Sequence, residues 1–186
     1  MLQLRYLVCA AIVAAAVPAL AQRTPDGQLL MEAVRAGDGA KAMQLLSANP
    51  TLVNTRDSKG QTPLLAAIDE DNEDWVGFLI KQGADVNAAN RAGDTPLILA
   101  TRSKSDVMVG WIIEAGARPN VNNKMGETAL IIAVQLRNVQ AIKRLLAAGA
   151  DPDKSDYSGH SARDYAKNET RMPIIMQLIE TTKPKQ

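Results

Sequence analysis

Short apolar runs recur along the chain, and each begins with a glycine followed two residues later by a hydroxyl residue. The run GQTPLLAA at residues 60–67 is followed by GDTPLILA at 93–100, GETALIIA at 126–133 and a weaker GHSARDYA at 159–166, so the leading glycines are 33 residues apart. A second landmark, Gly-Ala at 83–84, 116–117 and 149–150, keeps the same interval. Two landmarks in one register predict an array of structural repeats.

Each repeat contains the signals of two helices. Thr62 and Thr95 can cap a first helix with their hydroxyl groups, and the proline that follows each of them suits the first helical position, where a missing N–H costs nothing. A second helix holds more apolar residues, as over 75–80. Gly83 can end that helix in the left-handed conformation, and the polar stretch 85–93 predicts an extended turn to the next unit.

The pairing of Gly-x-Thr-Pro-Leu with Gly-Ala-Asp-Val-Asn at this interval resembles the ankyrin repeat. The resemblance implies an all-α solenoid of helix-turn-helix repeats joined by extended turns, with about five units including caps. We expect one domain over 22–181 and a tail at 182–186, with units of about 27–56, 57–89, 90–122, 123–155 and 156–181. In the last unit Arg163 and Asp164 replace an apolar pair, which fits a polar outer cap.

The chain departs from the family pattern at two positions of the repeat. Ankyrin repeats usually have histidine after Thr-Pro-Leu, and the Thr–His hydrogen-bond network cannot form here, so packing must replace it at Leu65, Ile98 and Ile131. The family's glycine between the two helices is kept as Gly37. Later units replace it with residues that favour positive φ less, at a cost of ~1 kcal/mol for the lysine and the arginine. We therefore expect a differently built loop at Asp71, Lys104 and Arg137.

The first residues have the pattern of a secretory signal peptide. Arg5 precedes an apolar run over 6–17, which is followed by a proline and the small-residue site at 19–21, so cleavage is expected after Ala21. The run is shorter than the ~18 to 20 apolar residues of a membrane anchor. We expect a periplasmic protein, with secretion as the alternative and no membrane attachment after cleavage. Cys9, the single cysteine, lies in the removed segment, so no disulfide can form in the mature chain.

Composition narrows the class of partner. With 186 residues, 46% of them hydrophobic, the chain is long enough for one domain with a sizeable core. Removal of residues 1–21 takes away one of the 21 basic residues and none of the 20 acidic ones, which leaves 20 of each. Nucleic acid is a poor partner for so balanced a chain.

The sequence contains little that could perform catalysis. His160 is the only histidine and the mature chain has no cysteine, so neither a catalytic triad nor a metal site is expected, and no cofactor. Asp94 and Glu127 form the only plausible carboxylate pair across repeats, but the spacing of packed helical layers puts them ~10 Å apart, too far to share a proton. Trp75 and Trp111 fall at core positions of the second helix. An enzyme with a carboxylate site in the groove is therefore the least favoured alternative.

The resemblance also implies where a partner binds. Ankyrin repeats use the turn tips and the exposed end of the first helix, which line a concave groove. The partner-contact positions are then Lys59, Glu70, Arg91, Asp94, Arg102, Lys124, Met125, Glu127, Leu136, Tyr157 and His160. Among them Met125, Leu136 and Tyr157 would form an apolar centre inside a polar rim, as in protein interfaces. The sequence thus predicts a non-enzymatic, monomeric binding protein that holds another protein, such as an exported enzyme that it inhibits, protects against or assists. A self-assembling structural solenoid is the alternative.

The acidic stretch DEDNED at 69–74 has a structural explanation for most of its residues. A calcium loop is disfavoured, because an EF-hand needs glycine at the sixth position and glutamate at the twelfth, where this chain has Asp74 and Ile80. Asn72 can cap the second helix, and the two acids after it are stabilised by the helix dipole. Asp69 and Glu70 close the first helix at its negative end. We expect an ion-pair ladder of Arg35, Asp69 and Arg102, with Glu70 left for a partner.

Overall fold

Paired helices follow one another in the computed structural model, which describes residues 26–169 and 171–181. The predicted signal peptide at 1–21 and the tail at 182–186 lie outside the described residues. The elements are α1 (Asp26–Ala36), α2 (Gly39–Ala48), the 3-10 turn η1 (Pro50–Asn54), α3 (Pro63–Asp69), α4 (Glu73–Lys81), α5 (Pro96–Ser103), α6 (Asp106–Glu114), α7 (Ala129–Gln135), α8 (Val139–Ala147), α9 (Ala162–Lys167) and α10 (Pro173–Glu180).

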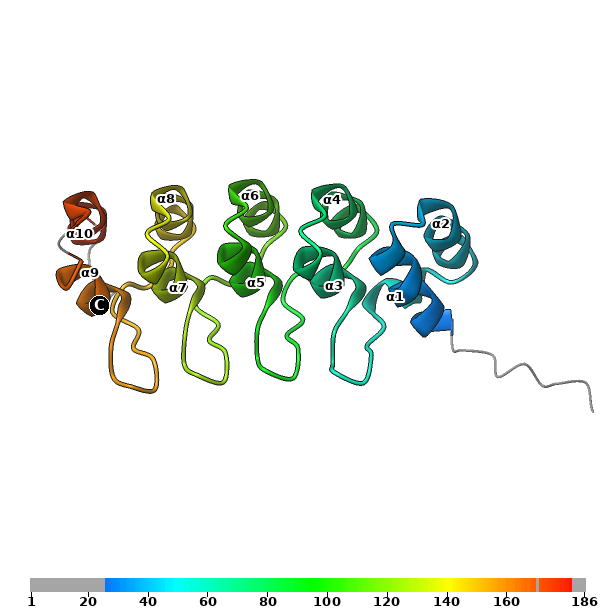
Figure 1. Cartoon of the computed structure of the whole chain (residues 1–186), viewed down its shortest axis with the longest axis horizontal. Coiled ribbons are helices and arrows are strands. Elements are labelled where there is room, and N and C mark those ends of the chain that lie inside the picture. Colours follow the sequence, from blue (N-terminus) through cyan, green and yellow to red (C-terminus); the bar gives the residue numbers. More distant parts are fainter. Residues whose placement is uncertain (1–25, 170, 182–186) are drawn as a thin grey trace, which may run out of the picture.

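The helices form two layers, and the turns between units project to one side (Figure 1). The odd-numbered helices, called here the inner helices, pack against one another in chain order from α1 to α9, and α4, α6, α8 and α10 pack likewise in the layer of outer helices. Only two isolated bridges, and no strand, occur in the described part of the chain. The predicted all-α solenoid is confirmed. Within 26–169 and 171–181, no helix has both the length and the hydrophobicity that crossing a bilayer requires.

The predicted helix signals are confirmed. The side-chain oxygen of Thr62 accepts a hydrogen bond from the N–H of Leu65 at 3.3 Å, and Thr95 caps α5 in the same way. Asn72 caps α4 through the N–H of Trp75 at 3.2 Å, and Gly83 has a φ of 85° just after that helix. Local chemistry therefore sets where each helix begins and ends.

Apolar packing takes the place of the family's histidine. The exposed fraction is at most 1% for Leu65, Ile98 and Ile131. Each also donates its backbone N–H to the capping threonine of its own helix, so the position is held by both the core and the cap. The expectation that packing replaces the Thr–His network is confirmed.

The loop between the two helices of a unit is not built differently in the central units, so that expectation was wrong. Asp71, Lys104 and Arg137 adopt φ values of 52°, 64° and 56°, in the same left-handed region as Gly37 at 71°. The cap that follows holds this conformation in place, because the side chain of the next residue bonds to the outer helix, as Asn72 does to α4. The strain of ~1 kcal/mol is therefore tolerated rather than avoided.

The two tryptophans have different environments. Trp75 is 8% exposed and packs edge-on against Phe78, with ring centroids 5.4 Å apart, as a core residue should. Trp111 is 38% exposed, so its predicted core position was wrong. Its ring lies against α4 at Gly77, which has no side chain. An ideal Cβ built on that glycine would stand 3.4 Å from the indole.

Each extended turn folds back as a hairpin, and neighbouring hairpins are joined by backbone hydrogen bonds. The N–H of Arg91 donates to the carbonyl of Lys59 at 3.2 Å, and the N–H of Tyr157 to the carbonyl of Met125 at 3.2 Å. Behind the hairpins, Asn87 accepts from the N–H of the residue 31 positions later and donates to a carbonyl 29 positions later. These bonds fix the spacing of successive units.

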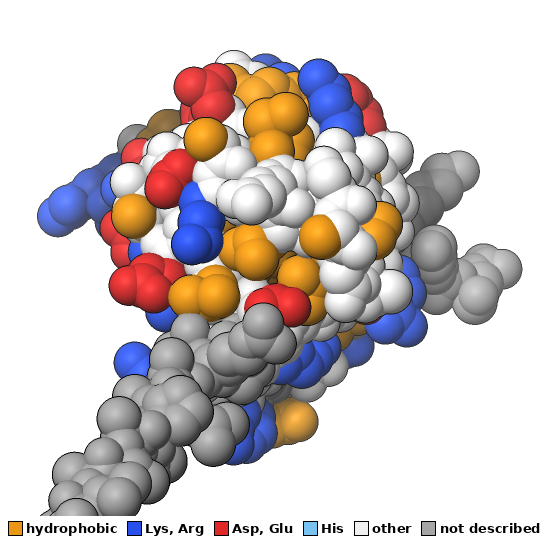
Figure 2. Space-filling model, turned by 90° about the vertical axis from the view of Figure 1, so that its right-hand side faces the viewer, with side chains coloured by type: hydrophobic (Ala, Val, Ile, Leu, Met, Phe, Trp, Pro, Cys, Tyr) orange, Lys and Arg blue, Asp and Glu red, His pale blue; other side chains and the backbone are white. Residues whose placement is uncertain are grey.

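The last unit ends the solenoid with paired polar groups. Arg163 donates to both carboxylate oxygens of Asp153, at 2.6 and 3.2 Å, and to the carbonyl of Ile179. Asp164 forms a capping box with Ser161 at the start of α9. At the opposite end of the molecule, seen in Figure 2, hydrophobic, basic and acidic side chains are mixed over the described surface.

Candidate functional site

Four hairpins and the inner helices behind them form one continuous face, called here the inner surface. A carboxylate or amide residue at the start of each hairpin holds its shape. The Oδ1 of Asp57, for example, accepts the N–H groups of Lys59 and Gln61 at 2.8 and 2.9 Å. The same pattern recurs at Asn90, Asn123 and Asp156. Such turns leave little freedom to the exposed residues at the hairpin tips.

Sequence reasoning missed these four turn residues, although a signal was present. An acid or amide recurs at positions 57, 90, 123 and 156, in step with the repeat. Aspartate and asparagine side chains bond to backbone N–H groups two residues on, so their recurrence could have predicted the turns.

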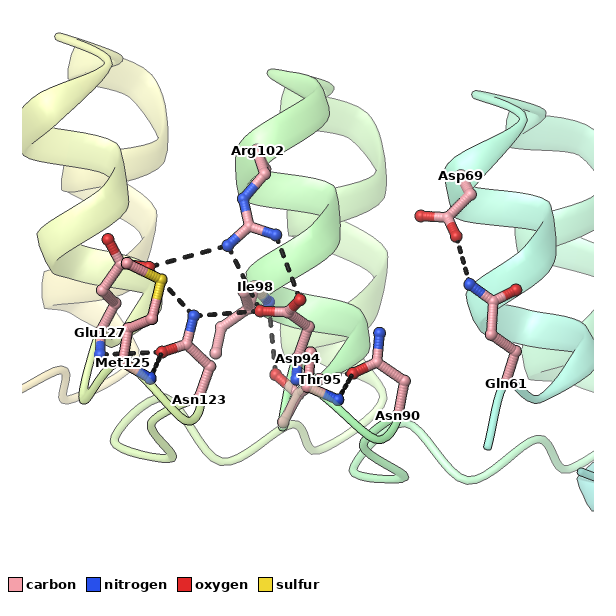
Figure 3. Close-up of polar contacts among 11 residues, drawn as sticks. Gln61, Asp69, Asn90, Asp94, Thr95, Ile98, Arg102, Asn123, Met125 and Glu127 are labelled. Atoms are coloured by element: carbon pink, nitrogen blue, oxygen red, sulfur yellow. Dashed lines mark hydrogen bonds and ion pairs between the residues drawn. The ribbon is translucent and has the colours of Figure 1, made fainter. Parts of the chain in front are cut away.

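The centre of the inner surface holds two carboxylates that share their donors (Figure 3). Arg102 donates to both oxygens of Asp94, at 3.2 and 3.3 Å, and its guanidinium lies 3.8 Å from Glu127. The Nδ2 of Asn123 donates to Asp94 at 3.1 Å and to Glu127 at 3.0 Å.

This arrangement corrects the expected separation of the pair. Both carboxylates contact one nitrogen atom of Asn123, so their oxygens are far closer than the ~10 Å that layer spacing suggested. Asp94 is only 8% exposed, and its two oxygens are occupied by internal donors. The residue therefore orders the hairpins and is not free to contact a partner. Glu127 is half-buried in the same cluster.

The predicted ladder of Arg35, Asp69 and Arg102 does not form. Arg35 instead donates to Asp57 of the next hairpin at 2.9 Å, and Asp69 accepts from the side-chain amide of Gln61 at 2.6 Å. The reason lies in the unit itself, because residues eight apart face each other between the hairpin and the last turn of the inner helix. Gln61 with Asp69, and Asp94 with Arg102, are therefore partners within their own units (Figure 3).

Replacing Asp69 with asparagine should change stability only slightly. The carboxylate is exposed and bonds to a neutral amide, and the amide oxygen of asparagine can accept the same hydrogen bond. We expect the free energy of unfolding to fall by less than about 1 kcal/mol, measured as a small decrease in the thermal midpoint. A loss as large as that of a core truncation would show that Asp69 has a structural role beyond this contact.

Two of the predicted partner-contact residues line a cleft of about 550 Å³ between α1 and α3. Lys59 comes from the first hairpin and Glu70 from the end of α3, and both are exposed. Asp69 and the Arg35–Asp57 ion pair complete its polar wall. The cleft presents charges of both signs, which suits a polar segment of another protein better than a small apolar ligand.

The apolar part of the inner surface consists of Met125 and Tyr157, which are 66% and 74% exposed at the tips of adjoining hairpins. The backbone bond between their residues holds them side by side, and Asn122 donates to the phenolic oxygen of Tyr157 at 3.4 Å. Leu136 does not extend this patch, contrary to expectation. It follows α7 directly and packs against the core, so it is half-buried.

The remaining predicted positions are exposed, at the hairpin tips or the end of an inner helix: Arg91, Arg102, Lys124 and His160. The Nδ1 of His160 lies 3.2 Å from the hydroxyl of Ser158, and its ring contacts that of Tyr165 with centroids 5.6 Å apart. Among the described residues, no group of three or more histidine, cysteine or acidic side chains could hold a metal ion.

Hydrogen bonding lowers the pKa of Asp156 at the last hairpin. Burial raises the pKa of this carboxyl. The side-chain hydrogen bonds from Ser158 and Tyr165, together with the N–H groups of His160 and Ser158, outweigh that effect and lower it from 3.8 to about 2. The depressed pKa means that the ionised carboxylate stabilises the folded hairpin above pH 3.8, and that this contribution is lost as the pH falls toward 2.

Asp156→Asn should therefore lose stability near neutral pH. In the wild-type protein the hydroxyl of Tyr165 donates to the Asp156 carboxylate at 2.7 Å. The asparagine side chain keeps an oxygen for the backbone N–H groups but presents an NH₂ group to that hydroxyl. Thermal unfolding of both proteins should show a lower midpoint for the variant at about pH 6, with the difference shrinking between pH 3.8 and 2. A difference that stays constant over that range would contradict this role for the carboxylate.

Comparison with known proteins agrees with this architecture. The family model described as ankyrin repeats (3 copies) matches residues 30–123 and 107–184. No curated protein matches the chain. The two matched stretches overlap and together include all the hairpins of the inner surface.

Proposed function

We propose, from the premise that the chain belongs to the ankyrin repeat family, that it is a non-enzymatic protein that binds another protein through its inner surface. Ankyrin repeats are generally protein–protein interaction modules. Recognition would use the hairpin tips together with the polar cleft between α1 and α3.

One observation supports this proposal above the others. Met125 and Tyr157 are the two most exposed large hydrophobic side chains in the described chain, and they lie on adjoining hairpins. Aromatic and methionine side chains are enriched at the centre of protein interfaces. Internal hydrogen bonds fix the hairpin backbones that carry both residues, so binding would cost little backbone conformational entropy there.

The surroundings of this pair support a polar rim. Lys124 is exposed beside Met125, and His160 is exposed beside Tyr157. Arg91 and Lys59 stand at the tips of the two preceding hairpins. Charged residues around an apolar centre favour orientation and association rate more than affinity.

The proposed location is based on the predicted signal peptide. The protein would be exported to the periplasm, or secreted, and would bind a partner such as an exported enzyme that it inhibits, protects against or assists. It would act as a monomer, because the solenoid ends in the paired polar groups of Arg163 and Asp164.

A capture experiment tests the inner surface. Wild-type protein immobilised on beads should retain a partner from periplasmic extract, and the double variant Met125→Glu with Tyr157→Ala should retain at least ~10-fold less, because hot-spot residues contribute about 2 kcal/mol or more each. Met43→Glu is the matched control, since Met43 is 58% exposed on α2, away from the hairpins. Capture that is unchanged in the double variant would contradict the proposal.

A further inference from the structure

An apolar cleft of about 560 Å³ opens between the outer helices α4 and α6. These two helices belong to the layer away from the hairpins (Figure 1). The cleft is called here the outer cleft. Phe78 of α4 and Trp111 of α6 contribute aromatic rings to its lining, and Trp111 is 38% exposed. None of the residues assigned to the inner surface lines it.

The outer cleft depends on a glycine at a position where helices disfavour glycine. Gly77 lies in the middle of α4, at a cost of ~1 kcal/mol relative to alanine. A Cβ at this position would stand 3.4 to 3.7 Å from three atoms of the Trp111 ring. The indole is therefore supported by the backbone of α4 on one side, while part of it remains in contact with solvent.

The next pair of outer helices repeats this arrangement with a cation in place of the indole. Gly110 stands in α6 where Gly77 stands in α4, and the residue that lies against it is Arg144 of α8. An ideal Cβ at Gly110 would be 2.9 Å from the Nη1 atom of Arg144. Arg144 is one repeat interval after Trp111, so a guanidinium group covers Gly110 where an aromatic ring covers Gly77.

The charge around the outer cleft is predominantly negative. Its lining includes the carboxylates of Glu73, Asp74 and Glu114 and a single cation, Lys81. Glu73 accepts a hydrogen bond from the hydroxyl of Ser105 at 2.7 Å. Among the residues that the structure describes, neither Asp74 nor Glu114 takes part in an ion pair. The outer cleft therefore combines two aromatic rings with an excess of negative charge.

We propose that the outer cleft is a second docking site, which binds a basic segment of a partner protein by inserting an arginine or lysine beside Trp111. The aliphatic stem would pack on the rings of Phe78 and Trp111, the cation would interact with the indole face, and the head group would reach Asp74 or Glu114. Because this site lies on the opposite layer from the inner surface, the protein could hold two partners at the same time.

The test uses the full mature chain and a short capped peptide in which arginines flank a leucine, labelled with a dye for fluorescence anisotropy. A second peptide with citrulline in place of arginine keeps the shape and removes the charge. Wild type should bind the arginine peptide saturably at up to millimolar concentration. Asp74→Asn combined with Glu114→Gln should weaken binding at least ~5-fold, as should Trp111→Ala, and raised salt should weaken binding to wild type.

Matched controls separate the outer cleft from general electrostatics and from the inner surface. Glu32→Gln combined with Glu180→Gln removes two exposed carboxylates elsewhere and should leave binding unchanged. Met125→Glu with Tyr157→Ala should also leave it unchanged, so failure of the inner-surface proposal would not affect this result. Because Trp111→Ala could also alter folding, the charge variant provides an independent readout, with thermal midpoints recorded for all proteins.

Three results would overturn the proposal. The first is no saturable binding of the arginine peptide. The second is equal binding of the citrulline peptide, or equal binding to the charge variant. The third is concentration-dependent dimerisation, seen by light scattering, that Trp111→Ala abolishes, because the outer cleft would then receive a second copy of the chain.

Discussion

Replacing Gly126 with alanine should lower the free energy of unfolding by about 3 kcal/mol, combining ~1 to 2 kcal/mol for the left-handed backbone with ~1 to 3 kcal/mol for overpacking. Gly126 has a φ of 83°, which side chains with a Cβ rarely adopt. A Cβ there would also stand 2.4 Å from the backbone nitrogen of Tyr157 and 2.9 Å from two backbone atoms of Asp156. Backbone atoms cannot rotate away as a side chain can, so the last two hairpins must separate.

Gly159→Ala is the matched control for this prediction. Gly159 occupies the same position of the next unit with a φ of 85°, but no atom lies within 4 Å of its ideal Cβ. It should therefore show only the backbone cost of ~1 to 2 kcal/mol. Urea unfolding followed by far-ultraviolet circular dichroism measures the free energy of unfolding of both variants. Equal losses in the two variants would show that contact between hairpins contributes little.

The Gly126→Ala substitution should also reduce partner capture. The hydrogen bond from the N–H of Tyr157 to the carbonyl of Met125 lies directly beside Gly126. Moving the two hairpins apart would separate the exposed side chains of these residues. We expect Gly126→Ala to lower capture at temperatures where circular dichroism shows it still folded, and Gly159→Ala to lower it less.

Ile131→Ala should cost about 2 to 5 kcal/mol of unfolding free energy, the range for truncating a fully buried isoleucine. Ile131 is 0% exposed and lies in α7, which packs against α5, α8 and α9. In a solenoid each unit is stabilised mainly by its neighbours, so a cavity in a central unit weakens interfaces on both sides. The loss should appear as a lower urea midpoint.

Ile174→Ala is the control for the core prediction. It removes the same atoms from a side chain that is 40% exposed on α10. Surface truncations usually change stability by no more than about 0.5 kcal/mol. A loss at Ile131 as small as that at Ile174 would mean that apolar packing does not replace the family's histidine network in this chain.

The fold could be predicted from sequence because its determinants are local and repeated. A threonine cap, a proline after it and a glycine at the helix end act within a few residues of themselves, and the fixed interval shows that each unit obeys the same rules. Even the left-handed residue between the helices kept its conformation when glycine was replaced by Lys104. The bonds around it mattered more than its intrinsic preference.

The contacts of the inner surface could be predicted only in part, because the repeat gives a residue's position but not the direction of its side chain. Arg102 has acids within reach in its own unit and in the next, and geometry selects Asp94 and Glu127 rather than Asp69. Likewise, the ring of Trp111 approaches the backbone of α4 closely at a glycine in the preceding unit. These contacts form between neighbouring units, and neither periodicity nor helix propensity indicates which side chains will meet there.

The two sides of the solenoid differ in how strongly they resist bending. The helices are held by packed layers, whereas the tips of neighbouring hairpins are joined by single backbone bonds such as that from Lys124 to Ala92, at 2.9 Å. A change in the curvature of the long axis would therefore alter the spacing of the hairpin tips more readily than the packing of the helical layers. A partner that grips Met125 and Tyr157 would set this curvature, and part of the binding energy would be stored as elastic deformation along the array.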